Sequence, residues 1–318
     1  MIFMLMLLGL LAGIILANQN PVNAFLRTYI GSPSRTSLIS FTVGVIFLAI
    51  ILVCTGVPLL PTGAEMAHTP VWMWLGGGLA AIYLTTFILL FPKIGAIQTA
   101  ILPILGQVLM GTAIDTFGLF GNKVIQLTGQ RILGIIILLF GIFIAVVWAN
   151  YQRSDKKLSG KQVTKQGGLG LNIWRVWAVI AGVLSAMQQA INGQLGIALS
   201  SPVKATFVSF SLSWVVLIFI VLVMDHRIMP KVIEVKNMPW WGWLGGILGA
   251  LFVLLTVILV PKIGAGLTVT TILVGQLGGS IVVAQWGLWH SPIAPVKRLQ
   301  IIGILVMLVG VLVIKGII

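Results

Sequence analysis

Long apolar runs alternate with short polar segments along the whole chain. Each run holds enough apolar residues to cross roughly 30 Å of hydrocarbon as a helix. The pattern therefore predicts an all-α integral membrane protein with ten transmembrane helices. Their expected ranges are about 3–26, 35–56, 71–91, 94–117 and 129–149 in the first half, and about 173–195, 203–224, 240–260, 263–286 and 299–316 in the second.

The ten predicted helices form two copies of one five-helix unit. Residue pairs that share an offset of 169 positions, without a gap, include Gly13 and Gly182, Gln19 and Gln188, and Asn23 and Asn192. We expect one unit in residues 1–150 and the other in 172–318, joined by a polar linker at 151–171. The sequence Pro-Lys-Ile-Gly occurs in both units, at 92–95 and 261–264. This link is so short that the third and fourth helices of each unit should be antiparallel neighbours.

An odd number of helices in each unit has a consequence for orientation. If one unit begins on one side of the membrane, the other must begin on the opposite side, so the two repeats are expected to have inverted topology. Of the 19 Lys and Arg residues, 14 fall on the side that holds the linker and five on the other. Because cytoplasmic loops carry an excess of Lys and Arg, we expect a multi-pass protein of the cell membrane with a cytoplasmic linker and both termini outside.

Composition agrees with this interpretation and excludes several classes of protein. Only 8% of residues are charged, 59% are hydrophobic and the mean hydropathy is +1.14, whereas soluble domains carry roughly 25% charged residues. The net charge of +14 lies between the apolar runs without interleaved aromatics, so nucleic acid is not an expected partner. Cys54 is the single cysteine and the three histidines are scattered, which predicts no metal site. No nucleotide-binding loop or nucleophile–base pair occurs, so we expect neither a cofactor nor an enzyme.

Each unit opens with an Ala-Gly pair, followed after five residues by Gln and then, four positions on, by Asn; the motif Ser-Pro, six residues and Ser-Phe comes next. Over residues 4–316, without the linker, the chain resembles the YdcZ-like branch of the drug/metabolite transporter superfamily. Many members of that branch are single five-helix units that work in pairs, and this chain looks like such a pair fused into one. The resemblance implies a central cavity lined mainly by the first four helices of each half. It also implies peripheral fifth helices, at 129–149 and 299–316, that support a homodimer.

Amides within the apolar runs are the candidate binding groups. Side chains four residues apart share one helix face, and polar groups at membrane depth normally face a bundle interior or a water-filled cavity. The alternative is that these amides only hydrogen-bond neighbouring helices. Tyr83 is a further candidate donor. The predicted substrate-binding residues are Gln19, Asn23, Gln107, Gln188, Asn192 and Gln276.

Acidic residues are scarce, and Asp115 is the one expected inside the membrane, near the end of its helix. Small multidrug-resistance relatives exchange protons for cationic drugs with a glutamate in the first helix, where this chain has amides. Asp115 is therefore a candidate coupling carboxylate. The alternative for a carboxylate at a helix end is that it is solvated or paired with Lys123.

Inverted repeats with a polar interface are typical of secondary transporters. We therefore expect a transporter, not driven by ATP, that moves small metabolites or drug-like solutes by alternating access through a site between the two repeats. A neutral, zwitterionic or amphipathic solute would suit a site lined by amides. A channel and a lipid-handling membrane protein are the alternatives.

Overall fold

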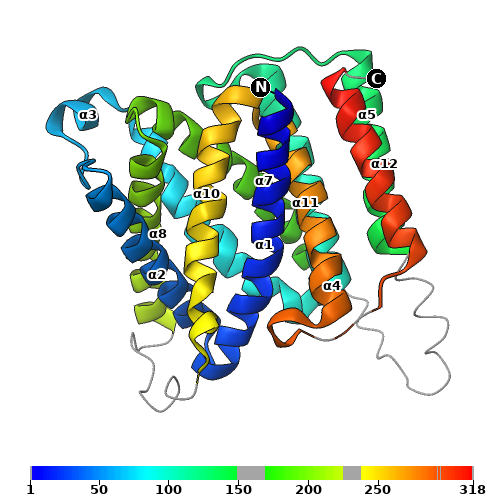
Figure 1. Ribbon diagram of the computed structural model, residues 1–318, viewed down its shortest axis with the longest axis horizontal. Helices are drawn as coiled ribbons and strands as arrows, with labels where there is room; N and C mark the ends of the chain where they lie inside the picture. The colour runs from blue at the N-terminus through cyan, green and yellow to red at the C-terminus, as the bar shows by residue number, and fades with distance from the viewer. Residues whose placement is uncertain (1, 149–168, 225–237, 292, 294, 317–318) are drawn as a thin grey trace.

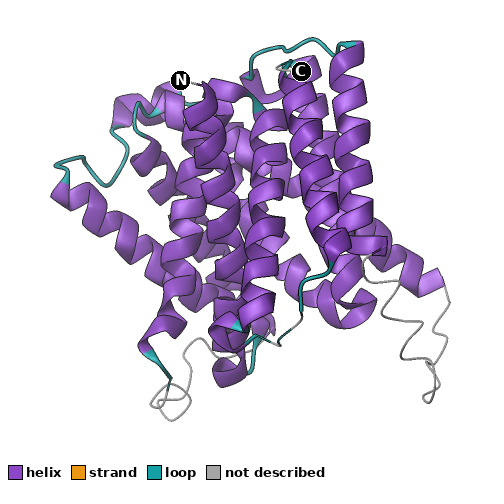
Figure 2. Cartoon of the chain, turned by 45° about the vertical axis from the view of Figure 1, so that its right-hand side comes forward, coloured by secondary structure: helices purple, strands orange, loops and turns teal. Residues whose placement is uncertain are grey.

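Helices make up the regular structure of the computed structural model, which describes residues 2–148, 169–224, 238–291, 293 and 295–316 (Figures 1 and 2). The predicted linker at 151–171 lies outside these residues except for its last three positions, where α7 has already begun. In the first half the helices are α1 (Ile2–Ile30), α2 (Pro33–Cys54), the short α3 (Gly63–His68), α4 (Leu75–Phe117) and α5 (Gly129–Ile142). In the second half they are α7 (Leu169–Ala198), α8 (Pro202–Met224), α10 (Leu244–Ile263), α11 (Ala265–Trp286) and α12 (Arg298–Lys315).

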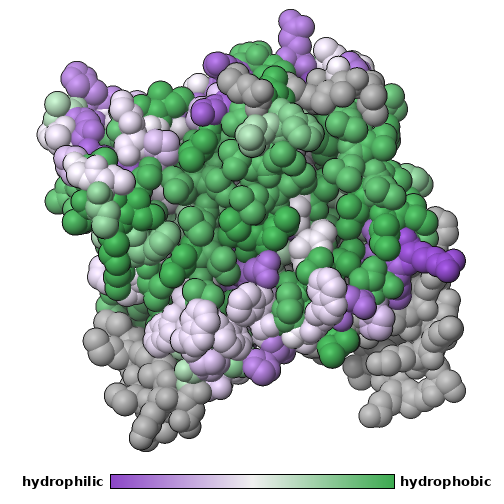
Figure 3. Space-filling model, in the orientation of Figure 1, coloured by the Kyte–Doolittle hydropathy of each residue, from purple (hydrophilic) through white to green (hydrophobic). Residues whose placement is uncertain are grey.

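Five of these helices are long and apolar enough to cross a membrane. On the face drawn in Figure 3, apolar side chains cover most of the middle of the molecule, and polar side chains gather toward its upper and lower ends. The prediction of an all-α membrane protein is confirmed. The five spans are Ile2–Ile30, Pro33–Cys54, Pro202–Met224, Trp240–Ile263 and Ala265–Trp286.

The second helix of each repeat begins in the same way. Ser32 precedes α2, and its side chain accepts a hydrogen bond from the backbone N–H of Arg35 at 3.5 Å. Ser201 precedes α8 and accepts from the backbone N–H of Lys204 at 3.2 Å. A proline follows each serine as the first helical residue, where its missing N–H costs nothing.

α4 corrects one sequence-based boundary. Two helices were expected at 71–91 and 94–117, but the helix is assigned without a break from Leu75 to Phe117. A straight helix of 43 residues would be roughly 64 Å long at 1.5 Å per residue. Yet the rings of Trp72 and Phe120, which flank its ends, lie 6.0 Å apart. The chain therefore reverses direction within α4, and its two arms lie side by side as the short link predicted.

The two halves pack on each other through reciprocal contacts. α1 lies against α10 and α11 of the second half, while α7 lies against both arms of α4 in the first. A Cβ built on Gly13 would meet the carbonyl oxygen of Ile272 first. One built on Gly182 would meet that of Pro103, which is the residue 169 positions before Ile272. Equivalent residues thus make equivalent contacts, as a two-fold arrangement requires.

The fifth helices pair with each other at one edge of the bundle (Figure 1). A Cβ on Gly134 would lie 2.8 Å from the carbonyl oxygen of Gly310, and one on Gly141 would lie 2.8 Å from that of Gly303. Small residues at both crossings let the backbones of α5 and α12 approach closely. The predicted peripheral position is confirmed, but these glycine faces are covered within the chain, and a homodimer through the fifth helices has no support here.

Candidate functional site

One face of α7 carries four buried polar side chains. Each lies three or four residues from two of the others, which places all four on one side of the helix. All four are buried, with 5% or less of each residue exposed. They are Ser185, Gln188, Gln189 and Asn192.

A hydrogen-bond network joins this face to α4. The side-chain amide of Gln107 donates to the hydroxyl oxygen of Ser185 at 3.2 Å. The amide of Gln189 donates to the same oxygen at 3.3 Å. The hydroxyl of Tyr83 is hydrogen-bonded to both Ser185 and Gln107. Groups from both arms of α4 therefore meet α7 at one polar cluster.

Three buried polar atoms beside this network have no hydrogen-bond partner within the described part of the chain. They are Nδ2 and Oδ1 of Asn192 and Oε1 of Gln189. The two residues are three positions apart and expose 0% and 3% of their surface, respectively. An unsatisfied buried polar group costs about 1–3 kcal/mol, so these atoms need an explanation beyond packing.

The equivalent face of α1 differs in this respect. Asn23 accepts a hydrogen bond at Oδ1 from the hydroxyl of Ser40 at 3.1 Å. Asn23 lies against Gly245, and Asn192 lies against Gly76 in the equivalent contact of the other half. Gln19 is half-buried, and its amide nitrogen lies against a glycine of α10. The two halves thus share the arrangement of their backbones but not of their hydrogen bonds.

The six predicted binding residues fall into two groups in the structure. Gln107, Gln188 and Asn192 belong to the α4–α7 side, where all three are buried. Gln19 and Asn23 lie on α1 against α10, and Gln276 is a half-buried residue of α11. The described contacts do not join the two groups, so a shared binding site stays a prediction.

Ser185 and Gln189 belong to the network but were absent from the predicted set. The residues equivalent to them are Leu16 and Asn20, so a search for matched polar pairs passes over Ser185 altogether. The helical spacing of Ser185, Gln189 and Asn192 within α7 was the signal that could have found them.

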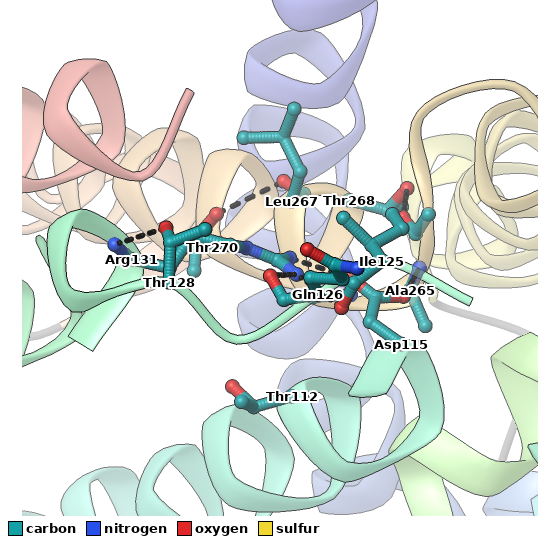
Figure 4. A network of polar contacts seen from close by, with 12 residues as sticks. Thr112, Asp115, Ile125, Gln126, Thr128, Arg131, Ala265, Leu267, Thr268 and Thr270 are labelled. Atoms are coloured by element: carbon teal, nitrogen blue, oxygen red, sulfur yellow. Dashed lines mark hydrogen bonds and ion pairs between the residues drawn. The ribbon is translucent and has the colours of Figure 1, made fainter. Parts of the chain in front are cut away.

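Asp115 lies outside this cluster and holds two elements together (Figure 4). Its Oδ1 accepts from the backbone N–H of Ala265 at 2.7 Å, and its Oδ2 accepts from that of Gly266 at 3.1 Å. Arg131 of α5 donates from Nη2 to Oδ2 at 2.9 Å. The carboxylate, which is fully buried, therefore satisfies free N–H groups at the start of α11.

The alternative for Asp115, that it is solvated or paired with Lys123, is wrong. Lys123 is exposed, whereas Gly264, with φ of 85°, ends α10 and turns the first N–H groups of α11 toward the carboxylate. Asp115 of the first half binds the start of α11 in the second half. The equivalent residue of the second half is Ala284, which has no carboxylate to do the same for the first half.

A second ion pair, Lys204 with Glu65, joins the two halves and should make the stability of the protein depend on pH. Lys204, buried at the start of α8, donates to both carboxylate oxygens of Glu65 in α3, at 2.8 and 2.7 Å. These hydrogen bonds, with one from the backbone of Thr62, lower the pKa of Glu65 from 4.5 to about 2. The pair should stabilise the protein fully above about pH 4.5, and this contribution should be lost as the pH falls toward 2.

The measurement is thermal unfolding of the wild type and Glu65→Gln between pH 6 and pH 3. We expect the variant to be less stable at pH 6 and to lose less stability on acidification. Lys123→Gln, a change at an exposed lysine, is the control and should follow the wild type. Parallel curves for the wild type and Glu65→Gln would contradict the assignment.

A bundle of long apolar helices with buried amides between them defines a multi-pass membrane protein. The chain belongs to the drug/metabolite transporter family whose description reads "Putative inner membrane exporter, YdcZ"; the family profile matches residues 4–144 and again residues 173–313. The resemblance noted from the sequence is thereby confirmed, and the family places the chain in the inner membrane.

Other comparisons add information about the fold alone. A solved structure described as "Crystal structure of protein" is similar to this chain with a TM-score of 0.69 at 15% sequence identity, over 99% of each chain. A likeness at this identity supports the arrangement of helices and carries nothing about substrate. No curated protein matches the chain.

Proposed function

We propose that this protein is a secondary carrier that moves a small metabolite or drug-like solute by alternating access. In this proposal, ten transmembrane helices form two inverted five-helix repeats, with residues 1–150 and 172–318 as the units and 151–171 as a cytoplasmic linker. Both termini lie outside the cell. The start of α1 and the end of α12 lie at the same end of the bundle, which agrees with an even number of crossings (Figure 1).

The reciprocal packing of α1 and α7 on the opposite half is the observation that carries the proposal. Two halves related in this way can exchange conformations, so a site between them opens to each side in turn. Both arms of α4 pack on α7, and both α10 and α11 pack on α1. Movement of α1 or α7 would therefore change the exposure of the amides that these helices carry.

We assign substrate binding to the predicted amides, with the α4–α7 group at the centre. Gln107 of the first half and Gln188 and Asn192 of the second are all buried, and Gln107 is bonded to Ser185, on the face of α7 that carries the other two. Gln19, Asn23 and Gln276 are proposed to contribute from the other half. Asp115 is fully engaged by two backbone N–H groups and Arg131, so we assign it a structural role, and coupling through it stays a sequence-based prediction.

Reconstitution into proteoliposomes tests the carrier proposal against its alternatives. A carrier is expected to give saturable uptake from a panel of labelled metabolites and drugs, and counterflow when the vesicles are preloaded with the unlabelled solute. Linear, unsaturable flux would instead indicate a channel. Movement of a fluorescent phospholipid from the inner to the outer leaflet of the same proteoliposomes would indicate a lipid-handling protein.

Removing one amide from each half tests the binding set. Gln19→Ala combined with Gln188→Ala should abolish saturable flux, because each side chain lies on the inward face of its helix. The variant should still purify as a folded monodisperse protein, since neither amide has a described hydrogen bond that joins two helices. Asn20→Ala, at an exposed position of α1, is the control. Loss of folded protein would favour a purely structural role of the amides.

A further inference from the structure

The three unpartnered atoms on α7 form a specific hydrogen-bonding pattern. Asn192 presents an acceptor, Oδ1, and a donor, Nδ2, side by side on one amide. Gln189, one turn before it on the same face, presents a further acceptor, Oε1, because its nitrogen is already bonded to Ser185. A partner that satisfies all three atoms must therefore supply two hydrogen-bond donors and one acceptor.

Unpartnered amide atoms of this kind occur on α7 but not at the equivalent asparagine of α1. Asn23, which is equivalent to Asn192, has a partner in Ser40. The equivalents of Tyr83 and Ser185 are Phe252 and Leu16, so the first half lacks the network that holds Gln189 in place. Two-fold packing alone would leave both asparagines alike, and the difference needs a separate cause.

The buried charges in the described part of the chain are already balanced, which favours an uncharged partner for the site. Among the described residues, the buried charged side chains are Asp115, Arg131 and Lys204, and each is already paired with an opposite charge. A carboxylate or ammonium group beside Asn192 would find no counter-ion. A neutral amide has matching geometry, because an amide edge pairs its adjacent donor and acceptor with those of another amide-like edge.

We propose that Asn192 and Gln189 bind the uncharged primary amide or equivalent amino–acceptor edge of the transported solute. Its carbonyl oxygen or ring nitrogen accepts from Nδ2 of Asn192. One N–H of its amino group donates to Oδ1 of Asn192, and the second donates to Oε1 of Gln189. This assignment rests on the proposed carrier function and narrows its substrate to neutral compounds with such an edge.

The first test uses stability without any ligand. Asn192→Leu replaces the unpartnered amide with an apolar side chain of similar size, so the melting temperature of the purified protein should rise. Asn23→Leu is the matched control in the other half and should lower the melting temperature, because it removes the bond from Ser40. A fall for Asn192→Leu similar to that for Asn23→Leu would overturn the proposal, since it would indicate a structural partner such as bound water.

The second test uses three probes that share one ring. Nicotinamide carries the full edge, 3-acetylpyridine lacks the two N–H donors, and nicotinate replaces the edge with a charged carboxylate. We expect nicotinamide to raise the melting temperature of the wild type in a concentration-dependent manner and to leave Asn192→Leu unchanged. The other two probes should give no shift. Equal shifts by all three, or none by nicotinamide, would overturn the assigned edge.

Counterflow measurements on the wild type and Asn192→Leu distinguish a wrong assignment of the amide edge from a wrong assignment of the carrier function. If Asn192→Leu keeps the counterflow of the wild type with unchanged KM, the inference fails while the carrier function stands. If the wild type shows no saturable counterflow with any solute of the panel, the carrier function itself fails. A loss of counterflow in Asn192→Leu, with a raised melting temperature, is the result expected here.

Discussion

Replacing Asp115 with alanine is expected to abolish most of the folded protein. The change leaves the guanidinium of Arg131 buried without a counter-charge and removes the acceptors for the N–H groups of Ala265 and Gly266. Breaking a buried ion pair from one side costs about 3–5 kcal/mol, and the lost helix cap adds about 1 kcal/mol. That sum is comparable to the whole stability of many domains, which is about 5–15 kcal/mol.

Fluorescence-detected size exclusion and thermal unfolding in detergent would measure this loss. Gln300→Ala is the matched control, because Gln300 stands where the second half would have Arg131. It removes one hydrogen bond, 2.9 Å long, to the backbone of Lys297 and should cost only about 1 kcal/mol. A folded Asp115→Ala protein that has lost transport alone would contradict the structural role and favour coupling.

Replacing Gly182 with leucine should be nearly as damaging. A Cβ at this position would lie 2.7 and 2.8 Å from the backbone C and Cα of Pro103, and a backbone cannot move aside as a side chain can. The substitution therefore forces α7 away from α4 and opens the packing around the buried network. Overpacking of this kind typically costs about 1–3 kcal/mol, and a contact with backbone belongs at the upper end.

Gly78→Leu is the matched control, since a Cβ built there meets nothing within 4 Å. Gly13→Leu should reproduce the effect of Gly182→Leu, because Gly13 makes the equivalent contact with the carbonyl oxygen of Ile272. Purified yield and melting temperature would be measured for all three variants. Similar values for Gly182→Leu and Gly78→Leu would show that the crossing of α7 and α4 tolerates separation.

The repeat made much of the fold predictable. An offset of 169 positions implies that any contact between the halves occurs twice, and the pairs around Gly13 and Gly182 follow this rule. Apolar runs also located the helices, because hydrocarbon length and helical rise leave little freedom in their size. The antiparallel arms of α4 followed from the short link alone.

The sequence did not predict the contacts in which the two halves differ. The one partner that the sequence offered for Asp115 was Lys123, eight positions away, but its partners come from α5 and from the other half of the chain. Asn23 and Asn192 look equivalent in the sequence, and so do the serines Ser40 and Ser209, yet only Asn23 has a described hydrogen bond to its serine. Such differences depend on distances between helices, which periodicity does not encode.

The covalent link between the two halves has a consequence for how the site can evolve. In an assembly of two identical units, every substitution appears twice, so a tyrosine, a carboxylate or an unpartnered amide must be accommodated on both sides. A fused chain can keep Tyr83 opposite Phe252 and Asp115 opposite Ala284. Each half is thereby free to acquire polar residues that the other lacks, and selection can act on each gene segment separately.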